Sequence, residues 1–193
     1  MRIKMASVPA SIYVRTKFNM EIRVKSLSRG FSLIELLIVM AVIMVIAAIA
    51  IPNFLRSRVA ANQASAVGSL RSLNTAEATY STTYGTGFST TLGYLGPPAS
   101  GAQTDQAHAG ILDDVLSGQD GAGSGAMSST KSGYQFTYSP GMAFNGIISS
   151  YTVIADPISR GYTGDNSYFM DESGVVRQNT STQASVADSP LAG

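Results

Sequence analysis

Residues that carry metal and redox chemistry are scarce in this sequence, which contains no cysteine, no tryptophan and one histidine, His108. Without cysteine, a disulfide framework, a thiolate metal site and a cysteine nucleophile are all excluded. His108 stands in the stretch DQAHAG with no second histidine and no pair of carboxylates beside it. A surface residue in a loop is therefore the better interpretation of His108, and the sequence predicts a protein that is not an enzyme.

Charge is also sparse, and its two signs are separated along the chain. The formal net charge is +1, yet residues 1–30 carry seven cations and one acid, whereas the remaining residues carry six cations and eleven acids. An acidic body argues against general binding of nucleic acid, which requires a cationic surface. We therefore expect no nucleic-acid partner.

The most prominent feature is an apolar run over residues 31–51, in which only Ser32 and Glu35 are polar. A helix of this length extends over about 31 Å, which matches the hydrocarbon thickness of a bilayer. The run predicts a membrane-spanning helix with a cytoplasmic N-terminus, because the residues before it are basic. Residues 1–30 are then a cytoplasmic tail or a leader that is removed, starting at Met1, Met5 or Met20.

Beyond the apolar run, residues 52–82 have the spacing of a moderately amphipathic helix. Pro52 removes one backbone N–H and predicts a kink or a restart of the helix. Apolar side chains then recur at steps of three, four and seven, at Val59, Ala66, Leu70, Leu73, Ala76 and Tyr80. The predicted helix therefore continues out of the membrane and offers one face to a folded body.

Residues 83–193 predict a loop-rich body with a small sheet. We expect loops over 95–110 and 117–133 and a short helical turn over 110–116. Strand patterns cover 134–138 and 150–156, and residues 167–178 read as two strands around a turn at Gly174. Three or four antiparallel strands packed on helix 52–82 give an α+β fold. Residues 179–193 are expected to fray, and the aromatic residues of the strands are expected in the core.

Taken together, RGFSLIELLIVMAVIMVIAAIAIPNF resembles the N-terminus of a type IV pilin or a type II secretion pseudopilin. The resemblance implies a long helix on a small antiparallel sheet, cleavage by prepilin peptidase after Gly30 and N-methylation of Phe31. It also implies that Glu35 is the glutamate that such proteins carry as the fifth residue after cleavage, and that Pro52 ends the membrane-embedded half of the helix. Met44 departs from the pattern, since many members carry glycine there and their helix unwinds near it in the filament.

The absence of cysteine is a second departure, because a disulfide fastens the C-terminal loop of many type IV pilins. The tail must then be held by strand pairing, by a bound ion, or not at all. We expect no cofactor. The acids at 113–114 and at Asp165, Asp171 and Glu172 nevertheless leave calcium binding in the C-terminal body open, beside their interpretation as solvated turn residues.

The presence of Glu35 in the apolar run needs a physical reason, because burying an ionised carboxylate in hydrocarbon without a partner costs about 3 kcal/mol. Cleavage would create such a partner, the α-amino group of Phe31. Pairing with the amine of an adjacent subunit would satisfy both charges and set the register of assembly. A protonated or snorkelling glutamate, or a pair within one helix, are the alternatives. Ala47, Ala48 and Ala50 offer a small-residue surface for helix packing.

The sequence thus predicts a structural subunit that polymerises with itself and other pilins. Its partners would be prepilin peptidase, an inner-membrane assembly platform and, before assembly, membrane lipid. We expect the inner membrane first and a periplasmic or extracellular filament afterwards. A type II secretion pseudopilin is the alternative. A third interpretation is a secreted or anchored binding protein or enzyme, cut by signal peptidase after Ala48-Ile49-Ala50 so that it starts at Ile51.

Overall fold

A computed structural model describes residues 30–191, apart from the side chains of residues 121–122. The predicted leader, residues 1–30, therefore lies outside the described residues except for Gly30. The chain divides into two compact units, one that ends at Val42 and one that begins at Ile43, which is called the head unit below. Each unit is described by itself.

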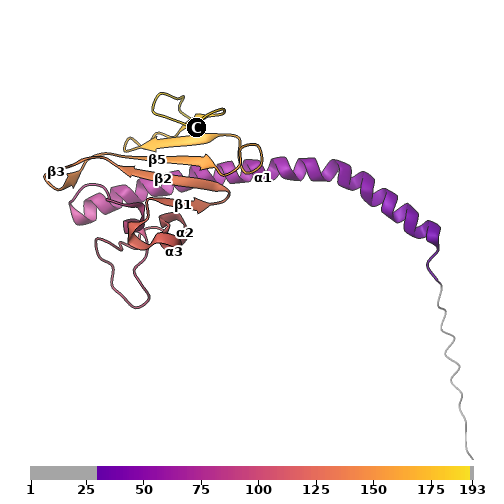
Figure 1. The fold of residues 1–193 in the computed structure, drawn as a ribbon, viewed down its shortest axis with the longest axis horizontal. Coiled ribbons are helices and arrows are strands. Elements are labelled where there is room, and N and C mark those ends of the chain that lie inside the picture. The colour runs from indigo at the N-terminus through magenta and orange to yellow at the C-terminus, as the bar shows by residue number, and fades with distance from the viewer. Residues whose placement is uncertain (1–29, 192–193) are drawn as a thin grey trace, which may run out of the picture. The chain divides into compact units, whose positions relative to one another are not determined.

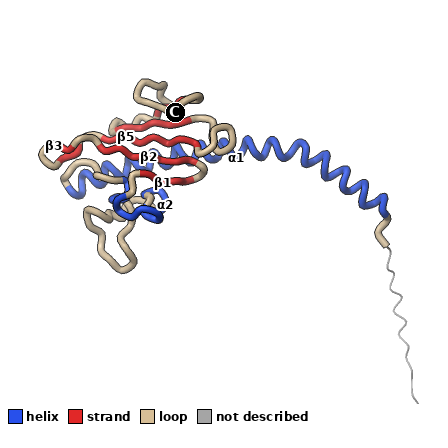
Figure 2. Tube along the Cα trace, viewed as in Figure 1, coloured by secondary structure: helices blue, strands red, loops and turns tan. Residues whose placement is uncertain are grey.

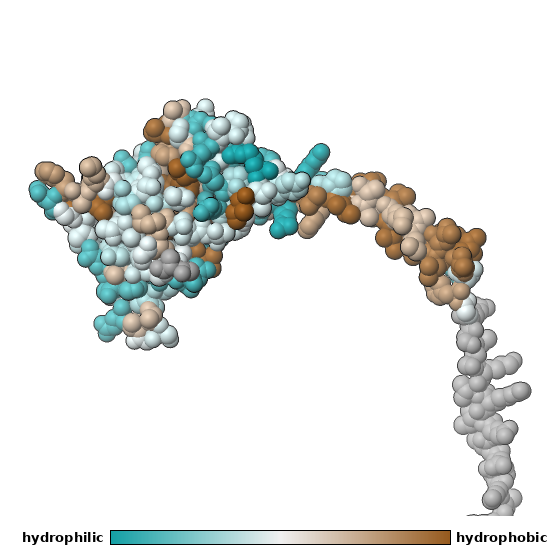
Figure 3. Space-filling model, in the orientation of Figure 1, coloured by the Kyte–Doolittle hydropathy of each residue, from teal (hydrophilic) through white to brown (hydrophobic). Residues whose placement is uncertain are grey.

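Helix α1 (Leu33–Tyr84) contains 52 residues and includes Pro52 without a break in its helical assignment. Its N-terminal part is the one described segment that is long and apolar enough to cross a membrane, and none of the side chains in that segment is buried. Figure 3 shows brown, hydrophobic side chains gathered along this part of the helix. The helix does not restart at Pro52 because proline removes only one hydrogen bond, and the helical turns on both sides persist. The predicted boundary between residues 51 and 52 stays a prediction.

The head unit is built on an antiparallel five-stranded sheet with the order β1-β2-β5-β6-β7. Its strands are β1 (Ser128–Lys131), β2 (Tyr134–Pro140), β5 (Tyr151–Pro157), β6 (Ser167–Asp171) and β7 (Arg177–Asn179). Figure 1 and Figure 2 show the C-terminal part of α1 running along this sheet. The remaining elements are η1 (Leu92–Leu95), α2 (Asp114–Ser117), α3 (Gln119–Ala122), η2 (Gly123–Gly125), β3 (Ala143–Phe144) and β4 (Ile147–Ile148).

The core forms where one stripe of α1 meets the inner face of the sheet. Strand β2 alternates strictly, with Tyr134, Phe136 and Tyr138 buried and the residues between them exposed. This period of two is what a half-buried strand requires. The helix contributes Ala66, Leu70, Leu73, Ala76 and Tyr80, and the sheet adds Tyr151, Val153, Ala155, Tyr168 and Met170. The predicted α+β class and the predicted core aromatics are confirmed.

The strand count was underestimated, because the sheet has five strands and a separate hairpin, β3–β4, stands beside it. Strand β1 and helix α3 both fall within 117–133, which the sequence predicted to be a loop. The sequence of β1, SSTK, is polar because this edge strand buries only Ser129. Two turns carry positive φ at consecutive residues, at Ser132–Gly133 and Asn145–Gly146. This is the geometry of two-residue hairpin turns, for which Asn-Gly is the strongest sequence signal.

The expectation of a frayed tail was wrong for the described residues up to Leu191. The Leu191 N–H donates to the carbonyl oxygen of Val176 at 2.8 Å, and the Gln178 N–H donates to that of Ser189 at 3.1 Å. Asp188 accepts hydrogen bonds from the N–H and hydroxyl of Ser185 and from the side-chain amide of Asn179. Strand pairing and a carboxylate-centred turn therefore hold the tail without a disulfide.

Candidate assembly site at the start of the helix

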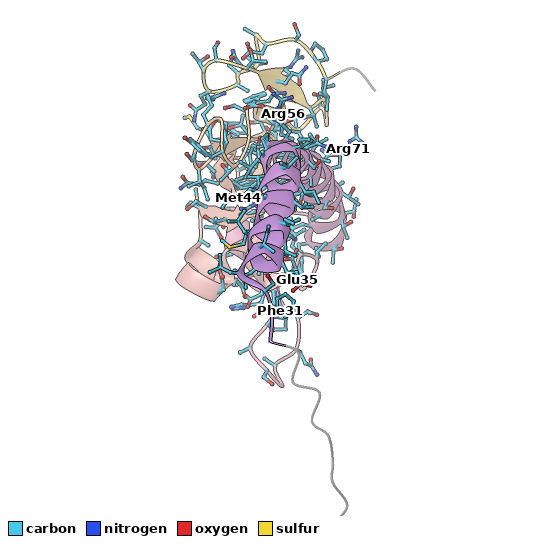
Figure 4. All side chains as sticks on the ribbon, turned by 90° about the vertical axis from the view of Figure 1, so that its right-hand side faces the viewer. Phe31, Glu35, Met44, Arg56 and Arg71 are labelled. Atoms are coloured by element: carbon cyan, nitrogen blue, oxygen red, sulfur yellow. The ribbon has the colours of Figure 1, made fainter. Side chains whose placement is uncertain are left out.

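The residues singled out by the sequence meet at the first turn of α1. Gly30 and Phe31 precede the helix, which begins at Leu33, and Glu35 is its third residue. The Glu35 Oε2 atom accepts a hydrogen bond of 3.0 Å from the Ser32 N–H. The Ser32 carbonyl oxygen in turn accepts one of 3.3 Å from the Leu36 N–H. Figure 4 labels Phe31 and Glu35 at this end of the chain.

This geometry gives Glu35 a local role that the sequence reasoning missed. The first N–H groups of a helix have no partner within the helix, and a glutamate three residues after a serine commonly reaches back to satisfy one of them. The spacing Ser32-x-x-Glu35 is the signal that would have found it. Within residues 30–191, the second oxygen of Glu35, Oε1, makes no hydrogen bond. Glu35 therefore stabilises its own helix with one oxygen and keeps the other available.

The surroundings of Glu35 are apolar and open. Phe31 is 79% exposed and Leu33 is 82% exposed, and the other apolar side chains of this turn are exposed as well. Met44 and Pro52, the other two residues of the predicted motif, belong to the head unit, and α1 is helical at both. The local site consequently consists of Gly30, Phe31, Ser32 and Glu35.

A second carboxyl group of α1, Glu77, is fully buried in the head unit, and no sequence pattern predicted its burial. Its Oε2 accepts from the Ser89 N–H at 2.9 Å, and its Oε1 lies 2.7 Å from the Ser89 hydroxyl. Tyr138 donates its hydroxyl hydrogen to the Ser89 carbonyl oxygen at 2.8 Å. Burial raises the pKa of Glu77, and the hydrogen bonds from Ser89 oppose that rise only in part.

The number of hydrogens at this cluster indicates which form of Glu77 fits. The Ser89 hydroxyl has one hydrogen but lies within hydrogen-bond distance of Glu77 Oε1, of the Thr91 carbonyl oxygen at 2.9 Å and of the Tyr138 hydroxyl at 3.2 Å. A protonated Glu77 donates to the Ser89 hydroxyl, which then donates to Thr91. With a neutral carboxyl group, the Ser89 hydroxyl oxygen and the Thr91 carbonyl oxygen both receive a hydrogen bond, which agrees with the raised pKa of Glu77.

Two of the acids considered as calcium ligands, Asp113 and Asp171, have other contacts in the structure. Asp113 accepts from the Leu116 N–H at the start of α2 and lies 3.0 Å from the Lys131 ammonium group. Asp171 accepts from the Ser173 N–H in the turn before Gly174. No group of three or more His, Asp or Glu residues is close enough to hold a metal ion in the described part of the chain. Calcium binding remains an untested prediction from the sequence.

Comparison with known proteins finds matches that cover only part of the chain. Residues 25–51 match the prokaryotic N-terminal methylation motif. A segment of 53 residues is 47% identical to the type IV major pilin protein PilA of Myxococcus xanthus (strain DK1622), and this segment is 28% of the chain and 24% of that relative. The match thus spans about a quarter of the relative's length. No solved structure matches the chain. The chain thus carries a prokaryotic N-terminal methylation motif and is similar to a type IV major pilin over a segment of 53 residues.

Proposed function

We propose that the protein is a structural subunit of a type IV pilus-like filament, cut after Gly30, N-methylated at Phe31 and polymerised through the N-terminal part of α1. The observation that carries the proposal is the exposed apolar helix whose first turn holds a half-satisfied carboxylate, Glu35, beside the Gly30–Phe31 junction. An apolar helix of this kind is stable in lipid or against other helices, and in water it is costly.

Glu35 would link processing to assembly. Cleavage converts the Phe31 N–H into a charged amine next to Ser32, whose own N–H Glu35 already holds. The unused oxygen, Oε1, would accept from the amine of a neighbouring subunit. In a filament core without lipid or water, loss of one partner leaves a buried charge and costs about 3–5 kcal/mol. The pair would therefore favour the one axial register in which both charges are matched.

The membrane stage would precede this step. The basic residues 1–30 favour a cytoplasmic N-terminus, and the subunit would lie in the inner membrane until prepilin peptidase and an assembly platform act on it. The matched relative is described as a major pilin, which supports the same assignment here by analogy of the N-terminal segment. The role is structural, and the sheet-bearing part of the head unit would form the outer surface of the filament.

The intact mass and N-terminal sequence of the mature protein test this proposal. We expect a start at Phe31 and a mass increase of one methyl group. Gly30→Val should retain the leader, whereas Ser28→Ala, two residues upstream, should be processed as the wild type is. A mature start at Ile51 would overturn the proposal in favour of a conventional signal peptide. Electron microscopy of sheared cells separates a long surface pilus from a short secretion pseudopilus.

A further inference from the structure

The hairpin β3–β4 presents an apolar tip made of Met142, Phe144 and Ile147. These side chains are 87%, 78% and 50% exposed, respectively. The hairpin is firmly attached at its base, where the Phe88 N–H donates to the Ile148 carbonyl oxygen at 2.9 Å and the Gly141 N–H donates to that of Ser150 at 2.8 Å. Gly87 allows this attachment, because a side chain there would collide with the backbone of Ile148. The tip is therefore an ordered apolar surface, which marks interaction sites on soluble domains.

A pocket lies at the other end of the head unit, where α1 passes the loop between β5 and β6. It has a volume of about 390 Å³, and its lining includes the side chains of Leu55, Val59, Ala60 and Tyr162 together with the charged residues Arg56 and Asp165. The loop is held by its own backbone, with the Thr163 N–H donating to the Ser159 carbonyl oxygen at 2.8 Å. This volume falls in the range of roughly 300–1,000 Å³ in which protein pockets enclose ligand groups. We call it the basal pocket.

The tip and the basal pocket of one copy cannot meet. Val59 and Tyr84 are separated by 25 residues of α1, or about 38 Å of helix, and the hairpin is attached just beyond Tyr84 through Phe88. Figure 1 shows β3 at one end of the sheet and the loop after β5 at the other. Figure 3 shows tan and brown atoms at the end that carries β3. Two copies, placed end to end, bring the two surfaces together.

Exposed arginines lie beside the basal pocket, and acidic residues lie at the end of the head unit that carries the tip. Arg56 and Arg58 are exposed on α1 beside the basal pocket. At the end with the tip, the Tyr84 hydroxyl binds the carbonyl oxygen of Asp105, and Asp171 is paired with Thr152 at the start of β5, next to Glu172. Arg56 and Arg58 of one copy would therefore face Asp171 and Glu172 of the next, while Asp165 is the one acid among the residues that line the pocket. Such an arrangement favours this orientation over tip-to-tip contact.

We propose that the apolar tip of one subunit occupies the basal pocket of a second copy, in a head-to-tail contact. The proposal rests on the proposed filament function and adds a second interface, between heads, to the one made by the N-terminal helices. Because the two surfaces differ, the contact is heterologous, and it extends into a linear polymer when the rotation between successive copies does not close a ring. It would space successive heads along one row by about 38 Å, from the helix length between the two sites.

Paired cysteines test the contact cleanly, because the chain contains no cysteine of its own. Full-length chains with both Phe144→Cys and Tyr162→Cys are expressed in cells that assemble the filament, and the sheared filaments are oxidised. We expect a ladder of covalent oligomers, since each copy carries both halves of the contact. The matched control combines Phe144→Cys with Val115→Cys, an exposed residue of α2 outside the pocket, and should give no ladder.

Filaments that contain both cysteines and give no ladder would overturn the head contact while leaving the filament function intact. A dimer from Phe144→Cys alone would also overturn it, because it would reveal a symmetric contact between tips. Exclusive crosslinking to a different protein would identify that protein as the occupant instead. Absence of filaments from the wild-type chain would overturn both proposals.

A second pair of variants provides a readout without crosslinking. Met142→Ser with Phe144→Ser removes the tip, and Val115→Ser with Val186→Ser removes two exposed apolar side chains elsewhere. We expect the first variant to lower the filament recovered after shearing by roughly tenfold or more, and the control to stay within about twofold. Thermal melting of the heads should be the same in both variants. Equal recovery of filament from the two variants would overturn the proposal.

Discussion

Two glutamates of helix α1, Glu35 and Glu77, have opposite surroundings. Glu35 lies exposed at the start of the helix among apolar side chains, and the described residues offer it one hydrogen bond, from the Ser32 N–H. Glu77 is fully buried in the head unit, where Ser89 contacts both of its oxygens. One helix thus carries a carboxyl group that its own subunit satisfies and another that its own subunit leaves half unsatisfied.

This difference in surroundings indicates that Glu77 contributes to folding of the head and that Glu35 contributes to assembly. A buried carboxyl group with complete hydrogen bonding specifies the packing of α1 on the sheet and has no further capacity to bind. An exposed carboxylate with one oxygen that accepts no hydrogen bond adds little to the stability of its own subunit. Its charge can still pair with a cation of another subunit. Substitutions at the two positions should therefore damage different properties of the protein.

The largest effect is expected for Glu35→Gln on filament formation. Glutamine keeps an oxygen that can accept from the Ser32 N–H, but it lacks the charge that would pair with the Phe31 amine. The Phe31 amine would then be buried in the filament core without its counter-charge, at a cost of about 3–5 kcal/mol, which should abolish most assembly, measured as subunit in the sheared fraction. Head stability should be unchanged.

Glu35→Ala provides the comparison for that experiment. It removes both the charge and the helix-capping oxygen, so assembly should fall as far as in Glu35→Gln and no further if charge is the decisive property. Filaments at wild-type levels in either variant would show that Glu35 does not register the subunits.

Glu77→Ala should leave membrane insertion intact and destabilise the head by about 3 kcal/mol, because the Ser89 N–H and hydroxyl lose their partner and a cavity remains. The measurement is the free energy of unfolding of the purified subunit in detergent. Glu77→Gln, of nearly equal size, should cost much less, since its amide can donate to the Ser89 hydroxyl. Equal losses in the two variants would contradict a neutral, hydrogen-bonding Glu77.

The same carboxyl group predicts a pH dependence of head stability. The pKa of Glu77 is raised in the folded head by burial, so its contribution is fully present below the unfolded pKa, about 4. The contribution is lost as the pH rises through the folded pKa, because the unfolded state releases its proton first. The facing tyrosines, Tyr80, Tyr138 and Tyr151, stay neutral in this range, since burial raises each of their pKa values. Wild type should therefore lose melting temperature relative to Glu77→Gln on going from pH 4 upward.

A smaller effect of opposite sign is expected at the tail. Hydrogen bonds from the backbone and hydroxyl of Ser185 lower the pKa of Asp188. Its contribution is present above the unfolded pKa and is lost as the pH falls through the folded pKa. Limited proteolysis should cleave near residues 180–191 sooner in Asp188→Ala than in wild type at neutral pH, with wild type approaching the variant in acid. Indistinguishable cleavage at neutral pH would show that Asp188 does not hold the tail.

Much of the fold could be predicted from the sequence because it follows from strong hydrophobic periodicity. The helical stripe from Ala66 to Tyr80 and the strand at 134–138 bury side chains at regular intervals, and the structure has both. The apolar run was predictable from its length and composition, and it forms the exposed N-terminal part of α1. The turn at Gly174 between β6 and β7 was predictable because glycine between two strand-like segments indicates a turn. The structure agrees, since Gly174 has a φ of 72°, which favours glycine.

The missed features depend on polar contacts between residues far apart in the sequence. Glu77 is buried in a network with Ser89, which lies 12 positions from Glu77, and with Tyr138, which lies 49 positions from Ser89. No local sequence pattern predicts such a network. The polar edge strand β1 is defined by its pairing with β2. The β3–β4 hairpin is different, because Asn145-Gly146 was a readable turn signal. Its two-residue strands were too short to show alternation.

The way the C-terminal tail closes also bears on where the head can fold. Val176, Gln178 and Asp188 fasten the tail through hydrogen bonds, and Leu191 packs against the core. These contacts need neither an oxidant nor a thiol isomerase, so the head should reach the same structure with or without reductant. A fibre built from such subunits would keep its surface unchanged when the oxygen or thiol content of its surroundings varies.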